Sequence, residues 1–244
     1  MSGHSKWTQI KHKKAGTDAK RGALFSKLAR TISVAARDGG ANPNLNARLR
    51  QAIEYASNAG LPKENIERAV SRAESANDIA NLKPVEYEAY GPGGIALIIA
   101  GLTDNSNRTT NEVKRILADH GGRLADAGSV AWMFDQRVLV SFPVEGESLD
   151  TIELSLIDAG AEDTAADTDH IEAIVVPENL GLFLEKAKKV GLAPTSTHLI
   201  AVPKSKIKAT AEVVETLTKL TDALDEHPDV QEVWTNARES SHTP

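Results

Sequence analysis

The side chains with the clearest chemical potential are the ammonium and guanidinium groups of the first 30 residues, with one indole ring among them. The candidate nucleic-acid-binding residues are Lys6, Trp7, Lys11, Lys13, Lys14, Lys20, Arg21, Lys27 and Arg30. Cations neutralise backbone phosphates whatever the base sequence, and an aromatic ring can stack on an unpaired base. We therefore predict that the cations bind phosphates, while Trp7 either stacks on a base or anchors the segment on the protein.

Charge is divided unevenly along the chain. The eight cations of residues 1–30 stand against Asp18 alone, a formal charge of +7, whereas the whole chain carries −6, so residues 31–244 carry −13. The acidic average would argue against a polyanionic partner, but the local potential decides which partner is attracted. The segregation indicates a cationic head on an anionic body.

A run of lysines can also be a solvated tail without a partner. Two features favour a binding surface here. Trp7 and Ile10 interleave with the lysines, and helical spacing places Lys20, Lys27 and Arg30 on one arc beside an apolar face. Arg21 falls within the apolar arc, so we expect it at an exposed helix end.

The sequence contains no recognisable catalytic motif and no metal-binding motif. The absence of cysteine excludes disulfides, Cys-ligated zinc and thiol catalysis. The seven histidines form neither an HExxH nor an HxxxH pair, and His120 shares the apolar face of a predicted helix. We therefore predict no enzymatic activity, no metal and no cofactor.

Two polar loops invite a functional interpretation. Gly91-Pro92-Gly93-Gly94 lacks the spacing of a phosphate-binding loop and is followed by a strand, so a tight hairpin turn is expected. In the second loop, around residues 104–108, Asn107 or Thr109 is expected to cap the following helix. The alternative for this loop is a surface contact led by Arg108.

Residues 1–79 are predicted to form a basic three-helix bundle. Leu24, Leu28 and Ile32 share one face of a helix over 17–37, which Gly39 and Gly40 end. Further amphipathic helices are expected over 44–59 and from Pro62, the latter suited to a first helical turn.

The pattern changes to α+β from residue 80. Strands are expected over 85–90, 95–103 and 129–134, with a helix ending near residue 120. The next segment has the order βαββαβ of a ferredoxin-like domain, with strands over 138–142, 161–166, 171–176 and 198–202 and helices over 148–159 and 179–190.

A helix over 210–225 and a strand over 230–235 are left, and they cannot bury a core alone. The predicted solution is a split α+β domain of residues 80–135 plus 204–240, with an inserted ferredoxin-like domain at 136–203. Two consecutive α+β domains are the alternative.

Neither a signal sequence nor an 18-residue apolar run occurs in the chain. We therefore expect no membrane partner and a cytoplasmic location.

Five local strings stand out in the chain: Gly3-His4-Ser5-Lys6-Trp7, Asp18-Ala19-Lys20-Arg21-Gly22, Ala35-Ala36-Arg37-Asp38-Gly39-Gly40, Tyr90-Gly91-Pro92-Gly93-Gly94 and Thr103-Asp104-Asn105-Ser106-Asn107-Arg108-Thr109. These strings resemble the YebC/PmpR family, which includes the mitochondrial translational activator of cytochrome oxidase. Ala23 and Thr31 depart from the resemblance, because relatives commonly carry a basic and an acidic residue there.

The resemblance implies a helical N-terminal domain, an α+β domain and an inserted ferredoxin-like domain. It also implies one of two roles: a DNA-binding transcriptional regulator, or a translation factor that binds ribosomal RNA and eases synthesis of proline-rich stretches.

Our leading prediction is a nucleic-acid-binding transcriptional regulator, with the ribosome-binding translation factor as the alternative. An enzyme acting on nucleic acid would require a catalytic cluster that the sequence does not indicate. Since no recognition helix is evident, we expect contact dominated by charge and shape. If about six cations meet duplex phosphates, log K should fall with log salt at a slope near −5.

Overall fold

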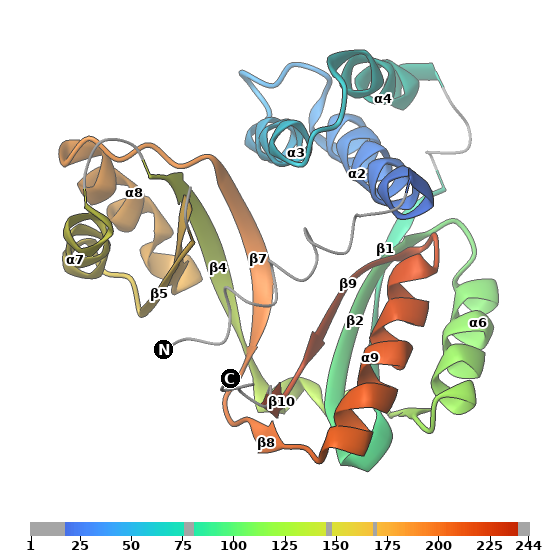
Figure 1. The fold of residues 1–244 in the computed structure, drawn as a ribbon. Helices are drawn as coiled ribbons and strands as arrows, with labels where there is room; N and C mark the ends of the chain where they lie inside the picture. Colours follow the sequence, from blue (N-terminus) through green and yellow to red (C-terminus); the bar gives the residue numbers. More distant parts are fainter. Residues whose placement is uncertain (1–17, 76–80, 145–147, 168–169, 239–244) are drawn as a thin grey trace.

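The computed structural model describes residues 18–75, 81–144, 148–167 and 170–238, with the side chains of 18–20 and 74–75 outside the description. These residues form a helical bundle, a first sheet with two helices and a second sheet with two further helices (Figure 1). The predicted fold class, helical bundle followed by α+β with a ferredoxin-like part, is confirmed.

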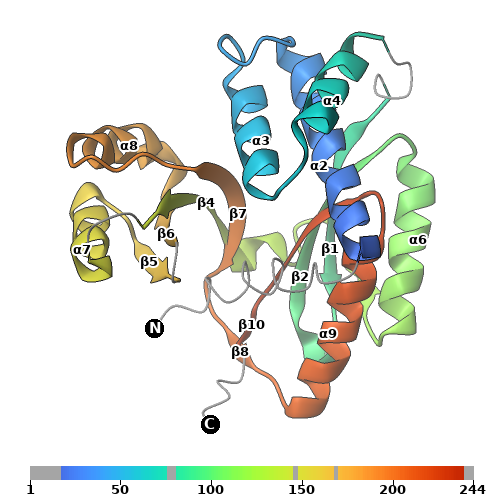
Figure 2. The same ribbon diagram turned by 45° about the horizontal axis from the view of Figure 1, so that its top comes forward.

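The bundle consists of α2 (Asp18–Gly39), α3 (Ala47–Asn58) and α4 (Lys63–Ser75). Its core includes Ile32, Leu49 and Ala56, each fully buried, so the predicted apolar faces do meet. The bundle lies at one end of the two sheets (Figure 2).

Asn46 determines where α3 begins. Its side chain accepts the Leu49 N–H at 3.0 Å and donates to the carbonyl oxygens of Ala35 and Gly40, both at 2.8 Å. The expected start at residue 44 was too early because this N-cap fixes the first helical residue at Ala47. Only a glycine fits at position 39, since a Cβ there would lie 2.6 Å from the Asn46 side chain.

The first sheet has the order β3-β1-β2-β9, and every neighbouring pair is antiparallel. Its strands are β1 (Lys83–Tyr90), β2 (Ala96–Thr103), β3 (Arg123–Leu124) and β9 (Val230–Thr235). The helices α6 (Ser106–Asp119) and α9 (Ala211–Glu226) bury Leu117, Leu220 and Leu224 against one face. The pairing of β9 with β2 places residues 230–235 beside residues 96–103, more than 100 positions earlier in the chain.

The hairpin turn predicted at residues 91–94 is present. It is a single 3-10 turn, η2 (Pro92–Gly94), in which Gly93 has φ 67° and Gly94 has φ 75°. Glycine adopts this left-handed conformation at no steric cost.

The strand predicted over 129–134 is wrong. A 3-10 turn, η3 (Ala131–Met133), occupies this segment, and the next strand begins at Phe134. The carboxylate of Glu88 accepts the N–H groups of Gly128, Val130 and Ala131 at 2.5, 2.5 and 2.8 Å, so these donors are not available to a strand ladder. The short β3 takes the sheet edge instead.

The second sheet has the ferredoxin-like order β5-β6-β4-β7, again antiparallel throughout. Its elements are β4 (Phe134–Pro143), α7 (Leu149–Ala159), β5 (Asp163–Ala166), β6 (His170–Val175), α8 (Leu180–Lys189) and β7 (Ser196–Pro203). Phe142 and Phe183 lie in its core with ring centroids 6.0 Å apart. The helices α7 and α8 cover the side of this sheet that faces away from α6 and α9 (Figures 1 and 2).

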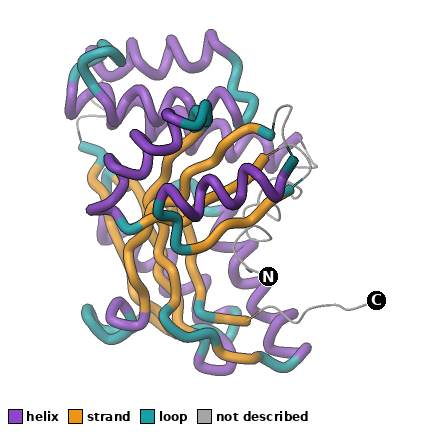
Figure 3. The backbone as a smooth tube through the Cα atoms, turned by 90° about the vertical axis from the view of Figure 1, so that its left-hand side faces the viewer, coloured by secondary structure: helices purple, strands orange, loops and turns teal. Residues whose placement is uncertain are grey.

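A parallel pair of two-residue strands, β8 (Ile207–Lys208) and β10 (Ala237–Arg238), was not predicted, because so short a strand leaves no periodicity. The tube in Figure 3 shows the strands running roughly lengthwise, with the bundle helices across one end. The exact domain boundaries at 79/80, 135/136 and 203/204 stay predictions.

Candidate nucleic-acid interface

The predicted phosphate-binding residues fall into three groups. Lys6, Trp7, Lys11, Lys13 and Lys14 lie outside the described residues. Lys20 belongs to α2, but its side chain is not described, while Arg21 in the same turn is exposed, as expected. For these residues, the prediction that they form one phosphate-binding surface therefore stays a prediction.

Lys27 and Arg30 require a correction. Lys27 is only 8% exposed, and its Nζ donates to the carbonyl oxygen of Asp225, near the end of α9, at 2.5 Å. Arg30 Nη1 donates to the carbonyl oxygen of Pro228 at 2.9 Å and to Asp229 Oδ1 at 3.0 Å. In this arrangement the two cations join the bundle to the first sheet rather than facing solvent as phosphate ligands.

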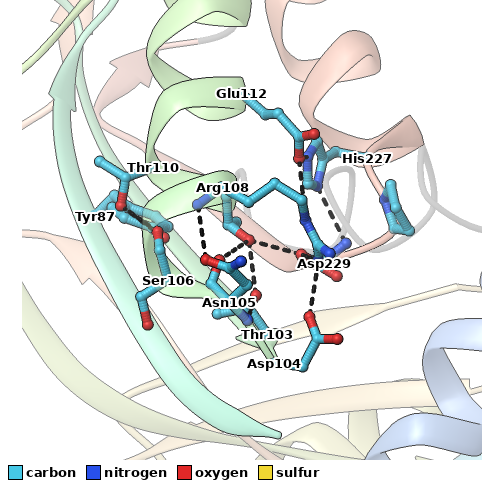
Figure 4. Close-up of polar contacts among 12 residues, drawn as sticks. Tyr87, Thr103, Asp104, Asn105, Ser106, Arg108, Thr110, Glu112, His227 and Asp229 are labelled. Atoms are coloured by element: carbon cyan, nitrogen blue, oxygen red, sulfur yellow. Dashed lines mark hydrogen bonds and ion pairs between the residues drawn. The ribbon is translucent and has the colours of Figure 1, made fainter. Parts of the chain in front are cut away.

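Asp229 is the centre of this contact (Figure 4). It is 2% exposed, and its Oδ2 accepts from Thr109 Oγ1 at 2.6 Å and from Arg108 Nη2 at 2.8 Å, while Oδ1 accepts from Arg30. Burial alone would raise the pKa of this carboxyl, but the hydrogen bonds from Thr109, Arg108 and Arg30 outweigh it and lower the pKa to about 2.

The first turn of α6 positions two of these donors. Asn105, rather than the expected Asn107 or Thr109, is the N-cap, and its side chain accepts the Arg108 N–H at 3.1 Å. Arg108 and Thr109 therefore lie at the end of β2, where Leu102 N–H donates to the Asp229 carbonyl at 2.8 Å. Both expectations for this loop hold in part: it caps a helix, and Arg108 makes a contact, although within the protein.

A histidine extends the network. His227 Nδ1 accepts the N–H of Asp229 at 3.1 Å, so Nε2 carries the proton and donates it to Glu112 Oε2 at 2.9 Å. Glu112, His227 and Asp229 each offer a ligand atom within 4.8 Å of the others. Both Asp229 oxygens are already occupied by arginine and threonine donors, however, and two guanidinium groups there would repel a divalent cation. This trio belongs to a network of hydrogen bonds and ion pairs, and it is not a metal centre.

His120, which helical spacing places on the apolar face, is hydrogen-bonded but not fully buried. It is the C-cap of α6, half-buried, and its Nδ1 lies 2.8 Å from the Ile116 carbonyl oxygen.

Exposed cations of α3 and α4 were missed by the sequence reasoning. Arg48 pairs with Asp38 at 3.4 Å, Arg50 donates to the Pro43 carbonyl at 3.0 Å, and Lys63 lies 3.7 Å from Glu67. Arg68 and Arg72 are exposed one turn apart on α4, and no carboxylate of the described chain lies within ion-pair distance of either. Their i, i+4 spacing on the polar side of α4 was the available signal.

The bundle also contacts the second sheet. The rings of Tyr55 in α3 and His198 in β7 meet edge to face with centroids 4.0 Å apart, and Asn58 Nδ2 donates to the Thr195 carbonyl at 2.6 Å. The helix α2 thus contacts the first sheet and its helices, and α3 contacts the second sheet. For α4, which carries Arg68 and Arg72, no side-chain hydrogen bond, ion pair or ring contact to either sheet is seen among the described residues.

The comparison with known proteins identifies the family of this chain. Residues 5–76 match the family described as the TACO1/YebC protein N-terminal domain, and residues 82–237 match the TACO1/YebC second and third domain. The chain belongs to the TACO1/YebC family. The two matched ranges follow one another in the order of helical bundle and α+β part seen here.

Individual TACO1/YebC relatives match over nearly their whole length. A probable transcriptional regulatory protein of Thermoanaerobacter pseudethanolicus is 45% identical over 238 residues, covering 97% of this chain and 96% of the relative. A probable transcriptional regulatory protein of Desulforamulus reducens is 42% identical, covering 98% and 100%. The crystal structure of a conserved hypothetical protein from Aquifex aeolicus superposes with a TM-score of 0.83 at 39% identity, covering 98% of this chain and 100% of that one.

Among the helices of the described chain, none has both the length and the apolar character needed to cross a bilayer.

Proposed function

We propose that this TACO1/YebC protein is a non-catalytic, cytoplasmic regulator of gene expression that binds nucleic acid through its helical N-terminal domain. The observation that carries the proposal is the charge of that domain. Residues 1–79 hold 14 cations and 7 carboxylates, a charge of +7, whereas the rest of the chain carries −13. A polyanion is attracted to the first part and repelled by the second.

The site is revised relative to the sequence prediction. Lys27 and Arg30 contribute to the domain contact, while the exposed Arg68 and Arg72 of α4 join the candidate phosphate ligands. The names of the relatives support transcriptional regulation, and DNA is therefore the first partner to test.

Titration of a labelled DNA duplex, followed by fluorescence anisotropy at several salt concentrations, tests the proposal. Replacing both α4 arginines, Arg68→Glu with Arg72→Glu, should weaken binding and reduce the magnitude of the salt slope by about 2. The matched control is Lys114→Glu with Arg115→Glu on α6, which changes the net charge equally but lies on an exposed face of the acidic part. Equal slopes for the two double variants would contradict the assignment to α4.

A translation factor is the second candidate. It is favoured by the fact that no base-reading helix was evident in the sequence, because a contact dominated by charge and shape suits structured RNA. Sedimentation of the protein with ribosomes through a sucrose gradient would support this role. Loss of co-migration in the Arg68→Glu, Arg72→Glu variant, but not in the control, would attribute it to the bundle.

A further inference from the structure

We propose that a second surface, at the end of the first sheet remote from the bundle, binds a single-stranded segment of nucleic acid by stacking an unpaired base on Trp132. This inference rests on the proposed function and adds a second site to it. We call this the Trp132 surface, and its members are Arg123, Trp132, Lys204, Lys206, Lys208 and Arg238.

The indole of Trp132 is both exposed and held in place. The side chain is 64% exposed, although its Nε1 donates to the Ser129 carbonyl at 3.0 Å. The turn that carries it is fixed by Glu88, whose carboxylate accepts the N–H groups of Val130 and Ala131. A ring that is already ordered loses little entropy when a base stacks on it.

A second aromatic side chain and a cation lie beside this turn. Tyr90 donates its hydroxyl hydrogen to the same Ser129 carbonyl oxygen at 3.2 Å, which brings the tyrosine next to Trp132. The guanidinium of Arg123 lies over the Tyr90 ring, 4.8 Å from its centroid. The exposed Arg123 is therefore ordered close to the place where a stacked nucleotide would carry its phosphate.

Lysines approach the turn from the other side. The N–H of Lys204 donates to the Met133 carbonyl at 2.9 Å, directly after Trp132, and its Nζ lies 3.5 Å from Asp135. Lys208 and Arg238 are register partners in the β8–β10 pair. No carboxylate of the described residues lies within ion-pair distance of Lys206, Lys208 or Arg238, all of which are exposed.

A row of backbone pairings across the end of the sheet links Arg123 to Ile207, which lies between Lys206 and Lys208. Arg123 pairs with Tyr90, Tyr90 with Ala96, Ala96 exchanges hydrogen bonds with Asn236, and Ile207 N–H donates to the Asn236 carbonyl at 2.7 Å. Four steps of about 4.8 Å give a row of roughly 19 Å. Such a length suits a short stretch of single strand, consistent with sites of about 4 or more nucleotides in other single-strand binders. In Figure 1, β8, β10 and the start of β4 lie at the end opposite α3 and α4.

The chemistry favours an unpaired strand over a duplex or a protein. Base pairs in a duplex hide the faces that an indole would stack on, whereas an unpaired base exposes one. A protein partner would bury an extended apolar patch. The exposed side chains of this surface are mainly cations, although Asp126, Asp135 and the apolar Ile207 lie near them.

Binding of labelled oligouridylate and oligothymidylate, each of about 12 nucleotides, tests this inference beside a DNA duplex. Trp132→Ala should weaken single-strand binding by roughly 5- to 150-fold, the equivalent of one lost stacking interaction, and leave duplex binding within about twofold. Trp132→Phe keeps an aromatic face without the indole N–H, so it should retain most of the affinity. Leu154→Ala on α7, 63% exposed at wild type, is the matched control and should change nothing.

A second variant addresses the cations without touching the turn. Lys206→Glu with Lys208→Glu should reduce the magnitude of the single-strand salt slope by about 1.4. A difference between the RNA and DNA oligomers would identify which strand the surface prefers, since the stacking chemistry is shared.

Three results would overturn the inference. Equal single-strand affinity of Trp132→Ala and Leu154→Ala would remove the stacking contact even if duplex binding by the bundle stands. Equal losses in Trp132→Ala and Trp132→Phe would assign the effect to the hydrogen bond to Ser129. Binding of neither duplex nor single strand by the wild type would defeat the proposed function as well.

Discussion

Arg30 Nη1 lies 3.0 Å from Asp229 Oδ1, although the two residues are 199 positions apart in the chain. Arg108 and Thr109 donate to the other oxygen of the same carboxylate. A cation that helical periodicity places on an exposed basic arc is therefore part of the contact between α2 and the loop that precedes β9. The contact shows that part of the positive charge near the N-terminus contributes to cohesion of the fold.

Removing the charge of Asp229 should destabilise the protein. Asp229→Asn leaves the Arg30 and Arg108 guanidinium groups without their buried anion, and we expect a loss of about 2 kcal/mol in the free energy of unfolding. Urea denaturation measures this difference. Asp119→Asn is the control, because its pair with Arg115 at 3.7 Å is exposed and should contribute less than about 0.5 kcal/mol. Equal midpoints for the two variants would contradict the central role of Asp229.

The Asp229 carboxylate should also make the free energy of unfolding depend on pH in the acidic range. Its pKa is lowered from 3.8 to about 2 in the folded protein, so the folded state binds this proton less readily than the unfolded state. The resulting stabilisation, about 2 kcal/mol, is present above pH ~4 and is lost as pH falls through ~2. The difference in unfolding free energy between wild type and Asp229→Asn should therefore shrink over that range. A difference that stays constant would show that the carboxylate is not perturbed.

Lys27 should affect stability and not nucleic-acid binding. Lys27→Met keeps much of the apolar stem but removes the ammonium donor to the Asp225 carbonyl, which we expect to cost about 1–2 kcal/mol of folding stability. The salt slope for duplex binding should equal that of the wild type. A fall of about 1 in the magnitude of the slope, with unchanged stability, would restore Lys27 to the phosphate-binding set.

Asn46 should be important for the integrity of the bundle. Asn46→Ala removes the N-cap of α3 and two hydrogen bonds to carbonyl oxygens near the end of α2, one of them buried, with an expected cost of about 2–3 kcal/mol. Thermal unfolding followed by circular dichroism checks this. Asn44→Ala, two residues away and exposed, should leave the transition in place; a comparable shift there would indicate a general effect of the loop.

The sequence predicted those elements in which the spacing of apolar residues within the element itself determines which face is buried. The strand Val230–Thr235 has the predicted boundaries, and the apolar stripe of Leu28 and Ile32 predicted the buried face of α2. The 3-10 turn at Ala131–Met133 could not be predicted, because the Glu88 carboxylate that fixes it comes from a strand more than 40 residues earlier. Helix starts moved by a few residues wherever a particular asparagine, Asn46 or Asn105, provides the cap.

The candidate site was predicted less well than the fold. Spacing alone places Lys27 and Arg30 on a basic arc. It does not reveal that the end of α9 contacts Lys27 and that Asp229 contacts Arg30. The spacing of Arg68 and Arg72 is visible in the sequence, but the two arginines stand out less than the dense positive charge of the first 30 residues. Trp132 is one of three tryptophans in the chain, and only the structure shows it exposed beside lysines.

The pairing of β9 with β2 has a consequence for how the protein is made. The first sheet takes its last strand from residues 230–235, so a nascent chain cannot complete this sheet until almost all of it has left the exit tunnel. The second sheet is contiguous between residues 134 and 203 and can form before then. Contacts of such long sequence separation form slowly. Until they form, β2 keeps an unpaired edge, and an unpaired edge can pair with another chain and lead to aggregation.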